Sequence, residues 1–255
     1  MKSIKILAAA AVTSGLALSS AHADGHTKPY TWSGIFIGAE GGQAFGGDAQ
    51  WTFEDYKRNG SPTSDRANNC NDGDDGTEGC DPTMDLGDGA LFGGFFGFQK
   101  QHGRFVLGAE ISHSATDLEG TEAGVDDDVF TTSIDALTTV ALKLGHVLGP
   151  QSRWLVYGKA GLAVANVETT IVDDEGDNVG TATDEKRHFG FLAGAGLEYM
   201  LTKNIVIGAE YNFMTFGSKT HEHTFIDDGD VRDTITDDVE IDSIQTIKAR
   251  VGYKF

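Results

Sequence analysis

The sequence is poor in positive charge. It has 19 Lys and Arg residues against 39 Asp and Glu residues, a formal net charge of -20 at pH 7. A chain this acidic repels the phosphate backbone, so nonspecific nucleic-acid binding is excluded. Proline is scarce at 4 residues, while the 34 glycines show no collagen-like repeat and are more than an ordinary enzyme carries. At 255 residues the chain has room for one all-β domain or two smaller domains.

Long apolar runs are also lacking. The longest, Ile6 to Leu18, follows two lysines and precedes Ala21-His22-Ala23, a small-x-small cleavage pattern. This order is typical of a secretory signal peptide, so we predict one over residues 1–23 and a mature domain over 24–255. No later stretch reaches the roughly 18 apolar residues that a transmembrane helix needs.

Cysteine is the third scarce residue. The only two, Cys70 and Cys80, lie in one Asp- and Gly-rich segment. In an exported protein the surroundings are oxidising, so we expect these two residues to form a disulfide. A metal site would need more ligands than two thiols supply, and no histidine lies nearby.

What the sequence has instead is a period of two, which is typical of β-strands. At the C-terminus Ile247, Val251 and Phe255 alternate with Lys248 and Arg250. The same alternation predicts eight strands, at about 33–45, 87–99, 104–113, 131–147, 153–168, 188–199, 204–216 and 247–255.

Short and long connections alternate between these strands. The short ones, 101–103, 149–151 and 201–204, are tight hairpin turns, and the long ones are 46–86, 117–130, 169–187 and 218–241. Most of the acidic residues lie in the long connections. We therefore predict an all-β fold, an eight-stranded antiparallel up-and-down transmembrane β-barrel with short periplasmic turns and long acidic external loops.

The polar face of the strands is unusual because it consists of glycines and charges. An eight-stranded barrel has a cramped interior in which glycine must alternate with long side chains, so this face should line the lumen. The apolar face would then contact lipid, with aromatic residues at the membrane interfaces. A soluble, lipocalin-like barrel with the two faces exchanged is the alternative. The predicted interface aromatics are Trp32, Trp154, Tyr199, Tyr211, Tyr253 and Phe255.

The predicted lumen charges have both signs. Opposite charges in a narrow interior are most stable in pairs, so we interpret them as a structural plug of salt bridges. A proton or ion pathway is the alternative. The predicted lumen charge network consists of Glu40, Glu110, Lys143, Lys159, Glu198, Glu210, Lys248 and Arg250.

The strand segments resemble a known family, the small outer-membrane β-barrel proteins of Gram-negative bacteria, often labelled porin family or opacity-type. The resemblance implies a place in the outer membrane. It also implies that the terminal aromatics Tyr253 and Phe255 form the signal read by the barrel-assembly machinery. The matching motifs are Trp32–Gly38, Phe105–Glu110, Leu155–Gly158, Gly194–Tyr199, Ile207–Tyr211 and Arg250–Phe255.

Three motifs could indicate a catalytic or metal-binding site. Ser112, His113 and Ser114 include a nucleophile and a base, but neighbours in a strand face opposite sides, so His113 cannot easily serve either serine. His221 and His223 would share one side of an extended chain and could hold a metal weakly. Asp72-Gly73-Asp74-Asp75-Gly76 is similar to a calcium loop but lacks the glutamate at its twelfth position.

We therefore expect a monomeric integral outer-membrane protein with a structural or surface-interaction role, no catalytic residues and no cofactor. The alternatives are a small-solute porin and a lipid-modifying outer-membrane enzyme. The expected partners are outer-membrane lipids, the barrel-assembly machinery and divalent cations at the external loops, with no nucleic acid.

Overall fold

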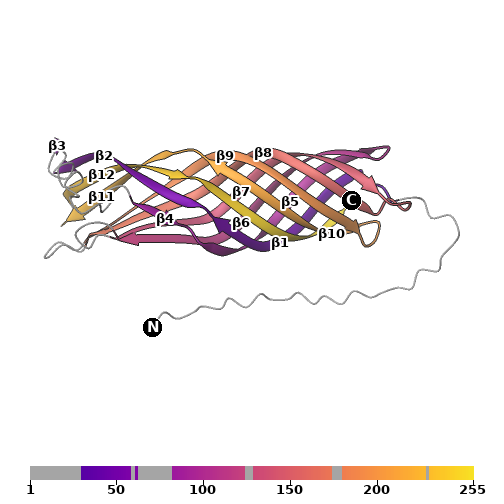
Figure 1. Cartoon of the computed structure of the whole chain (residues 1–255), viewed down its shortest axis with the longest axis horizontal. Coiled ribbons are helices and arrows are strands. Elements are labelled where there is room, and N and C mark those ends of the chain that lie inside the picture. The colour runs from indigo at the N-terminus through magenta and orange to yellow at the C-terminus, as the bar shows by residue number, and fades with distance from the viewer. Residues whose placement is uncertain (1–29, 59–60, 63–81, 124–128, 174–179, 228–229) are drawn as a thin grey trace, which may run out of the picture.

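The computed structural model describes residues 30–58, 61–62, 82–123, 129–173, 180–227 and 230–255 (Figure 1). The predicted signal peptide, both cysteines and the calcium-like segment lie outside this part of the chain. Within it, no helix is long and apolar enough to cross a membrane.

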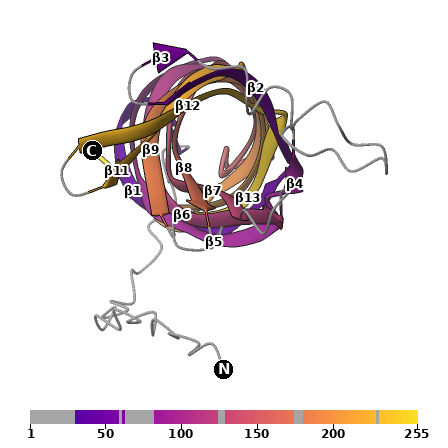
Figure 2. The same ribbon diagram turned by 90° about the vertical axis from the view of Figure 1, so that its left-hand side faces the viewer.

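Eight antiparallel strands close into a barrel, as the alternation predicted (Figure 2). The ring order is β1, β13, β10, β9, β8, β7, β6, β5, and β1 closes the ring by pairing with both β5 and β13. Closure matters because the bilayer interior offers no water to backbone N–H and C=O groups. In a closed ring these groups form hydrogen bonds with the neighbouring strands instead. The strands are β1 (Gly34–Gly46), β5 (Asp88–His102), β6 (Phe105–Ala123), β7 (Val129–Leu148), β8 (Trp154–Asp173), β9 (Gly180–Met200), β10 (Ile205–Phe216) and β13 (Ser243–Lys254).

The structure corrects the predicted long loops, because much of their described length forms β-strands. Two of them shrink because β6, β7, β8 and β9 continue well beyond the predicted ends. The other two form a second sheet of β2 (Asp48–Arg58), β3 (Ser61–Pro62), β4 (Thr83–Asp85), β11 (Lys219–Asp227) and β12 (Asp230–Ile241). Its order is β11-β12-β2-β3, with β4 also paired to β2.

The second sheet forms because its apolar residues still alternate, although acidic residues lie between them. Trp51, Ile235 and Ile241 point inward and are at most 2% exposed. Polar residues such as Glu240 face outward, where water solvates a carboxylate on a strand as well as on a loop, although Asp237 is buried. The upper part of the molecule, meaning this sheet and the far ends of β6 to β9, is therefore built like a soluble protein.

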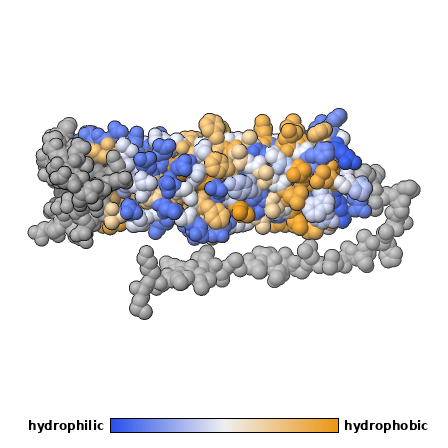
Figure 3. All heavy atoms as spheres, viewed as in Figure 1, coloured by the Kyte–Doolittle hydropathy of each residue, from blue (hydrophilic) through white to orange (hydrophobic). Residues whose placement is uncertain are grey.

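The lower part has the opposite arrangement. Leu107, Leu142 and Phe191 on its outer face are 62%, 66% and 73% exposed. Figure 3 shows apolar side chains gathering over the half that carries the short turns, with hydrophilic side chains toward the end formed by β2, β11 and β12. This band is the lipid-facing surface that the sequence predicted.

A β-bulge explains why the alternation in β7 is imperfect. Inward residues are even-numbered up to Ile134 and odd-numbered from Leu137 onward. Asp135 is an extra residue in the pairing of β7 with β8, whereas two residues of β6, Thr116 and Asp117, lie opposite it on the other side. A single extra residue reverses which side each later residue faces.

Most predicted interface aromatics lie on the outside, but Trp32 does not. Its side chain is 0% exposed, and its indole N–H donates to the Ser152 carbonyl at 2.9 Å. Trp32 precedes β1, so no strand pleat directs it outward, and it instead closes the turn end of the lumen. Trp154, Tyr211, Tyr253 and Phe255 are between 42% and 70% exposed, and Tyr199 is half-buried.

Candidate functional site

All eight predicted lumen charges are buried in the barrel interior, where the strand register brings them to similar depth. Glu40 on β1 lies opposite Arg250 on β13, and Glu210 on β10 lies opposite Lys248. Lys143 and Lys159 lie opposite each other on β7 and β8, although they have the same charge. Four carboxylates and four cations give a formal sum of zero, 4 minus 4.

Arg250 is the centre of this cluster, because its guanidinium reaches all four carboxylates. Its Nη2 lies 2.7 Å from Glu110 Oε2, and its Nη1 lies 2.6 Å from Glu210 Oε2. Its Nε lies 3.4 Å from Glu40, and Nη1 lies 3.8 Å from Glu198. Glu110 belongs to β6, which is not adjacent to β13 in the ring, so this contact crosses the bore.

The lysines neutralise the same carboxylates from the other side. Lys143 Nζ lies 2.6 Å from Glu198 Oε1, and Lys159 Nζ lies 2.7 Å from Glu210 and 3.3 Å from Glu110. This explains how Lys143 and Lys159 can be neighbours, because each has a carboxylate from another strand.

The Lys248 ammonium lies close to two carboxylates. Its Nζ lies 2.7 Å from Glu40 Oε1 and 3.4 Å from Glu210 Oε1. Glu40 is therefore the nearer partner of Lys248.

A double-mutant cycle should separate these two contacts. We expect Lys248→Met to couple to Glu40→Gln by about 1–3 kcal/mol, and more weakly to Glu210→Gln, because the shorter ion pair loses more when either partner is removed. Urea unfolding of the single and double variants, followed by heat-modifiability on gels, measures both coupling free energies. A larger coupling to Glu210 would show that Lys248 prefers the other carboxylate.

Two aromatic side chains complete the cluster. The Arg250 guanidinium lies 3.8 Å from the centre of the Phe95 ring, and Lys143 Nζ lies 3.8 Å from the centre of the Tyr157 ring. Cations stacked on aromatic faces keep a favourable interaction after losing water. The Tyr157 hydroxyl donates to Glu210 at 2.7 Å.

Glycines make room for these rings. A Cβ atom on Gly38 would lie 2.4 Å from the Phe95 ring, and one on Gly196 would lie 2.4 Å from the Tyr157 ring. The sequence indicated that glycine suits a cramped interior, and these contacts show which side chains need the space. The two rings themselves were missed, although both lie on the inward-facing set of their strands.

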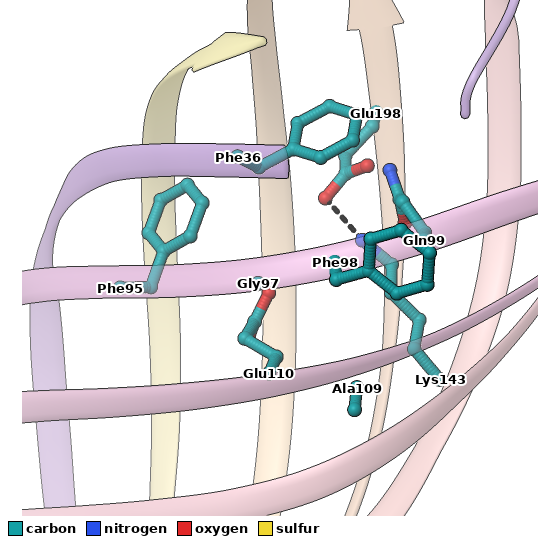
Figure 4. A pocket seen from close by; sticks show the side chains of 9 residues that line it. All are labelled: Phe36, Phe95, Gly97, Phe98, Gln99, Ala109, Glu110, Lys143 and Glu198. Carbon is teal, nitrogen blue, oxygen red and sulfur yellow. Dashed lines mark hydrogen bonds and ion pairs between the residues drawn. The ribbon is translucent and has the colours of Figure 1, made fainter. Parts of the chain in front are cut away.

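A small pocket lies beside the Lys143–Glu198 ion pair, between β5, β6 and β7 (Figure 4). Its free space is sufficient for about one water molecule. The side chains that line it are Phe36, Phe95, Phe98, Gln99, Ala109, Glu110, Lys143 and Glu198, together with Gly97.

Apolar layers cover the charge cluster on both sides. A buried group that includes Trp32, Val106, Leu155 and Met200 closes the turn end. A larger buried group fills the upper part and extends to Trp51.

The other candidate motifs have different surroundings. Ser112 and Ser114 point inward, and Ser114 donates to Glu40 at 2.9 Å. His113 points outward and contacts Thr138, so it is not arranged to activate either serine. His221 and His223 are buried in the upper part together with His188, which the sequence did not single out. Tyr253 and Phe255 lie exposed at the turn end with their ring centres 4.9 Å apart.

Comparison with known proteins gives a consistent result. The family model "Outer membrane protein beta-barrel domain" matches residues 8–255. The 22 kDa outer membrane protein of Rhizobium leguminosarum bv. viciae is 31% identical over 135 residues, which are 51% of this chain and 56% of that protein. The chain thus spans little more than half the length of that relative. The 31 kDa outer-membrane immunogenic protein of Brucella melitensis is 27% identical over 197 residues, 74% of this chain and 73% of that protein.

Solved structures share the fold. The outer membrane protein OprG from Pseudomonas aeruginosa superposes with a TM-score of 0.50 at 17% identity, covering 89% of this chain and 98% of OprG. A major outer membrane protein from Thermus thermophilus gives 0.53 at 10% identity, covering 88% of this chain and 100% of that protein. Together with the barrel, its lipid-facing band and the family match, these findings show that the chain belongs to the outer-membrane β-barrel domain family and is a protein of the bacterial outer membrane.

Proposed function

We propose that this protein is a closed barrel with a structural or surface-interaction role, and that its lumen does not conduct solutes. One observation carries the proposal: the Arg250 cluster extends across the bore from β13 to β6, with every member at most 8% exposed. Eight strands leave space only for side chains, and here these side chains are paired.

Two further features support a closed lumen. Apolar layers lie above and below the cluster, so an ion would have to pass buried hydrophobic side chains on both sides. The cluster is also formally neutral, so it offers no net charge to attract an ion of either sign.

The upper part is the surface through which such a protein would act. Its strands carry many acidic residues, among them Glu54, Glu119, Glu185 and Glu240, so part of the anionic surface lies on a folded scaffold. We infer partners that tolerate an anionic surface, with divalent cations among them. Outer-membrane lipids would contact the apolar band, and the barrel-assembly machinery would read Tyr253 and Phe255. We propose a monomer without enzymatic activity.

Planar-bilayer recording of the refolded mature chain tests the proposal. We expect no steady conductance, because paired side chains and apolar layers fill the bore. A steady open level in the wild type would favour the small-solute porin instead. Altered lipid composition in cells that overproduce the protein, with a silent bilayer, would favour the lipid-modifying enzyme.

A further inference from the structure

The end of the barrel that carries the short turns is basic, although the chain as a whole is acidic. Between the lumen carboxylates and this end, the described segments 30–39, 97–109, 144–158, 199–209 and 251–255 contain no Asp or Glu. The opposing charge in them is the terminal carboxylate of Phe255, so five cations give a formal charge of 5 minus 1, or +4. These cations are Lys100, Arg104, Arg153, Lys203 and Lys254.

Each short turn carries a cation one or two residues beyond an outward apolar side chain. Arg104 directly precedes Phe105, and Arg153 directly precedes Trp154, and both aromatic side chains face outward. A strand rises about 3.3 Å per residue, so these cations lie about 3–7 Å beyond the apolar band. The headgroup layer of a bilayer occupies this depth, because it adds about 5–8 Å to each side of the hydrocarbon core.

The short turns of outer-membrane barrels face the periplasm. The cations therefore meet the periplasmic leaflet, which consists of phospholipids. Figure 3 shows hydrophilic side chains at this end of the molecule, beyond the apolar band. Phosphate groups are the anions of the headgroup layer, so positive charge at this depth attracts them.

Arg153 differs from the other exposed cations because tyrosine side chains hold its guanidinium in place. Its Nη1 donates to the Tyr199 hydroxyl at 2.8 Å, and its Nη2 donates to the Tyr30 hydroxyl and to the Leu201 carbonyl, the latter at 3.5 Å. The guanidinium carbon lies 4.5 Å from the centre of the Tyr30 ring and 5.6 Å from that of Tyr199. An arginine fixed in this way loses little further freedom when it binds an anion.

The two tyrosine hydroxyls add hydrogen-bond donors at the same place. Each hydroxyl oxygen accepts from Arg153, so its own hydrogen points away from the guanidinium and can donate to a further group. A guanidinium flanked by two O–H donors suits the oxygens of a phosphate group. We call Arg153 with the hydroxyls of Tyr30 and Tyr199 the Arg153 site.

The Arg153 site lies next to the lipid-facing surface. Tyr199 on β9 pairs in register with Trp154 on β8, and their ring centres are 4.5 Å apart. Since Trp154 faces outward, an acyl chain that contacts its ring would hold the attached headgroup beside Arg153. A soluble anion has no such second contact, so the position favours a phosphate that belongs to a lipid.

We propose that the Arg153 site binds the headgroup phosphate of a net-negative phospholipid in the periplasmic leaflet. A zwitterionic lipid such as phosphatidylcholine also has a phosphate, but its choline cation is repelled by the basic turn end. The proposal deepens the lipid contact proposed above and does not depend on whether the lumen conducts.

Quenching of tryptophan fluorescence by brominated lipids tests the site. The chain has three tryptophans, of which Trp32 and Trp51 are 0% exposed and Trp154 is 44% exposed. The mature chain is refolded into phosphatidylcholine vesicles that contain brominated acyl chains either on phosphatidylglycerol or on phosphatidylcholine, at equal mole fractions. Bromine quenches a tryptophan that it contacts, so the two quenching curves give the relative binding constant beside Trp154. The variant Trp154→Phe supplies the background.

We expect the wild type to prefer phosphatidylglycerol about fivefold, the ratio that corresponds to about 1 kcal/mol for one basic residue near an anionic surface. Arg153→Gln should bring the ratio close to one. The matched control Arg104→Gln removes the same charge at the same end but no part of the Arg153 site, so it should keep most of the preference.

Two results would overturn the proposal. An equal loss in Arg104→Gln and Arg153→Gln would show that diffuse charge, and not the Arg153 site, selects the lipid. A ratio near one in the wild type would contradict the site without any variant, so the test remains decisive if Arg153→Gln does not refold.

Two further measurements separate other sources of the anion. Inorganic phosphate should lower the quenching by brominated phosphatidylglycerol no more than sodium chloride of equal ionic strength does. A stronger effect of phosphate would overturn the lipid assignment in favour of a soluble ion. Purified peptidoglycan that retains the wild type in detergent micelles but not Arg153→Gln, together with equal quenching by both lipids, would assign the site to the cell-wall polymer instead. Neither result bears on conductance, so the closed lumen is tested separately.

Discussion

Replacing Arg250 with methionine should destabilise the barrel by about 3–5 kcal/mol, the range expected when one partner of a buried ion pair is removed. The guanidinium contacts Glu40, Glu110, Glu198 and Glu210, and three lysines alone cannot neutralise four carboxylates. The small pocket beside Glu198 has room for about one water molecule near the excess charge.

The urea midpoint of the refolded chain, with the m-value compared between variants, measures this loss. The second substitution Glu110→Gln in the Arg250→Met background should recover part of it, because it restores a formally neutral cluster. Arg104→Met, an exposed change at the turn end, is the control and should leave the midpoint nearly unchanged. An Arg250→Met barrel as stable as the wild type would show that the cluster does not hold the barrel together.

The second large effect concerns the outer face. Leu142→Lys should destabilise the barrel by about 2–4 kcal/mol in lipid, because it places an ammonium on the lipid-facing side near the middle of the band. Leu142 is 66% exposed in the isolated chain, so a soluble barrel would tolerate the same change. Unfolding by urea in phospholipid vesicles measures the difference.

The matched control is Thr121→Lys, an outward residue at the upper end of β6. This position belongs to the part built like a soluble protein, so the new lysine should remain in water and change stability little. A large loss of stability in Thr121→Lys would place the membrane boundary higher on the barrel than the band of exposed apolar residues indicates.

Much of the barrel was predictable because strand alternation is a local property. Ile247 and Val251 face outward and Lys248 and Arg250 inward for the same reason that neighbouring Cβ atoms point to opposite sides of a strand. The short turns between β5 and β6, β7 and β8, and β9 and β10 were equally visible. Even the imperfect pattern of β7 has a local cause, the residue Asp135, which is extra relative to β8.

The local pattern did not predict other features of the fold. An acidic segment such as 230–241 is compatible with a solvated loop or with the outward face of a strand in water, so composition alone did not distinguish them. The strand β12 forms because Ile235, Val239 and Ile241 find a buried interior to pack into. The sequence analysis placed Trp32 at the membrane interface because aromatic residues are common there. In the structure its side chain is buried and instead fills the turn end of the lumen.

The sequence by itself determined the eight strands of the lower barrel, their faces and the eight charges of the lumen network, because these depend on residues one or two positions apart. Only the tertiary structure decided which charges meet. Arg250 on β13 reaches Glu110 on β6, and His188 Nε2 on β9 lies 3.1 Å from His221 Nε2 on β11. Both contacts depend on the stagger between strands around a closed ring, and no single strand carries that information.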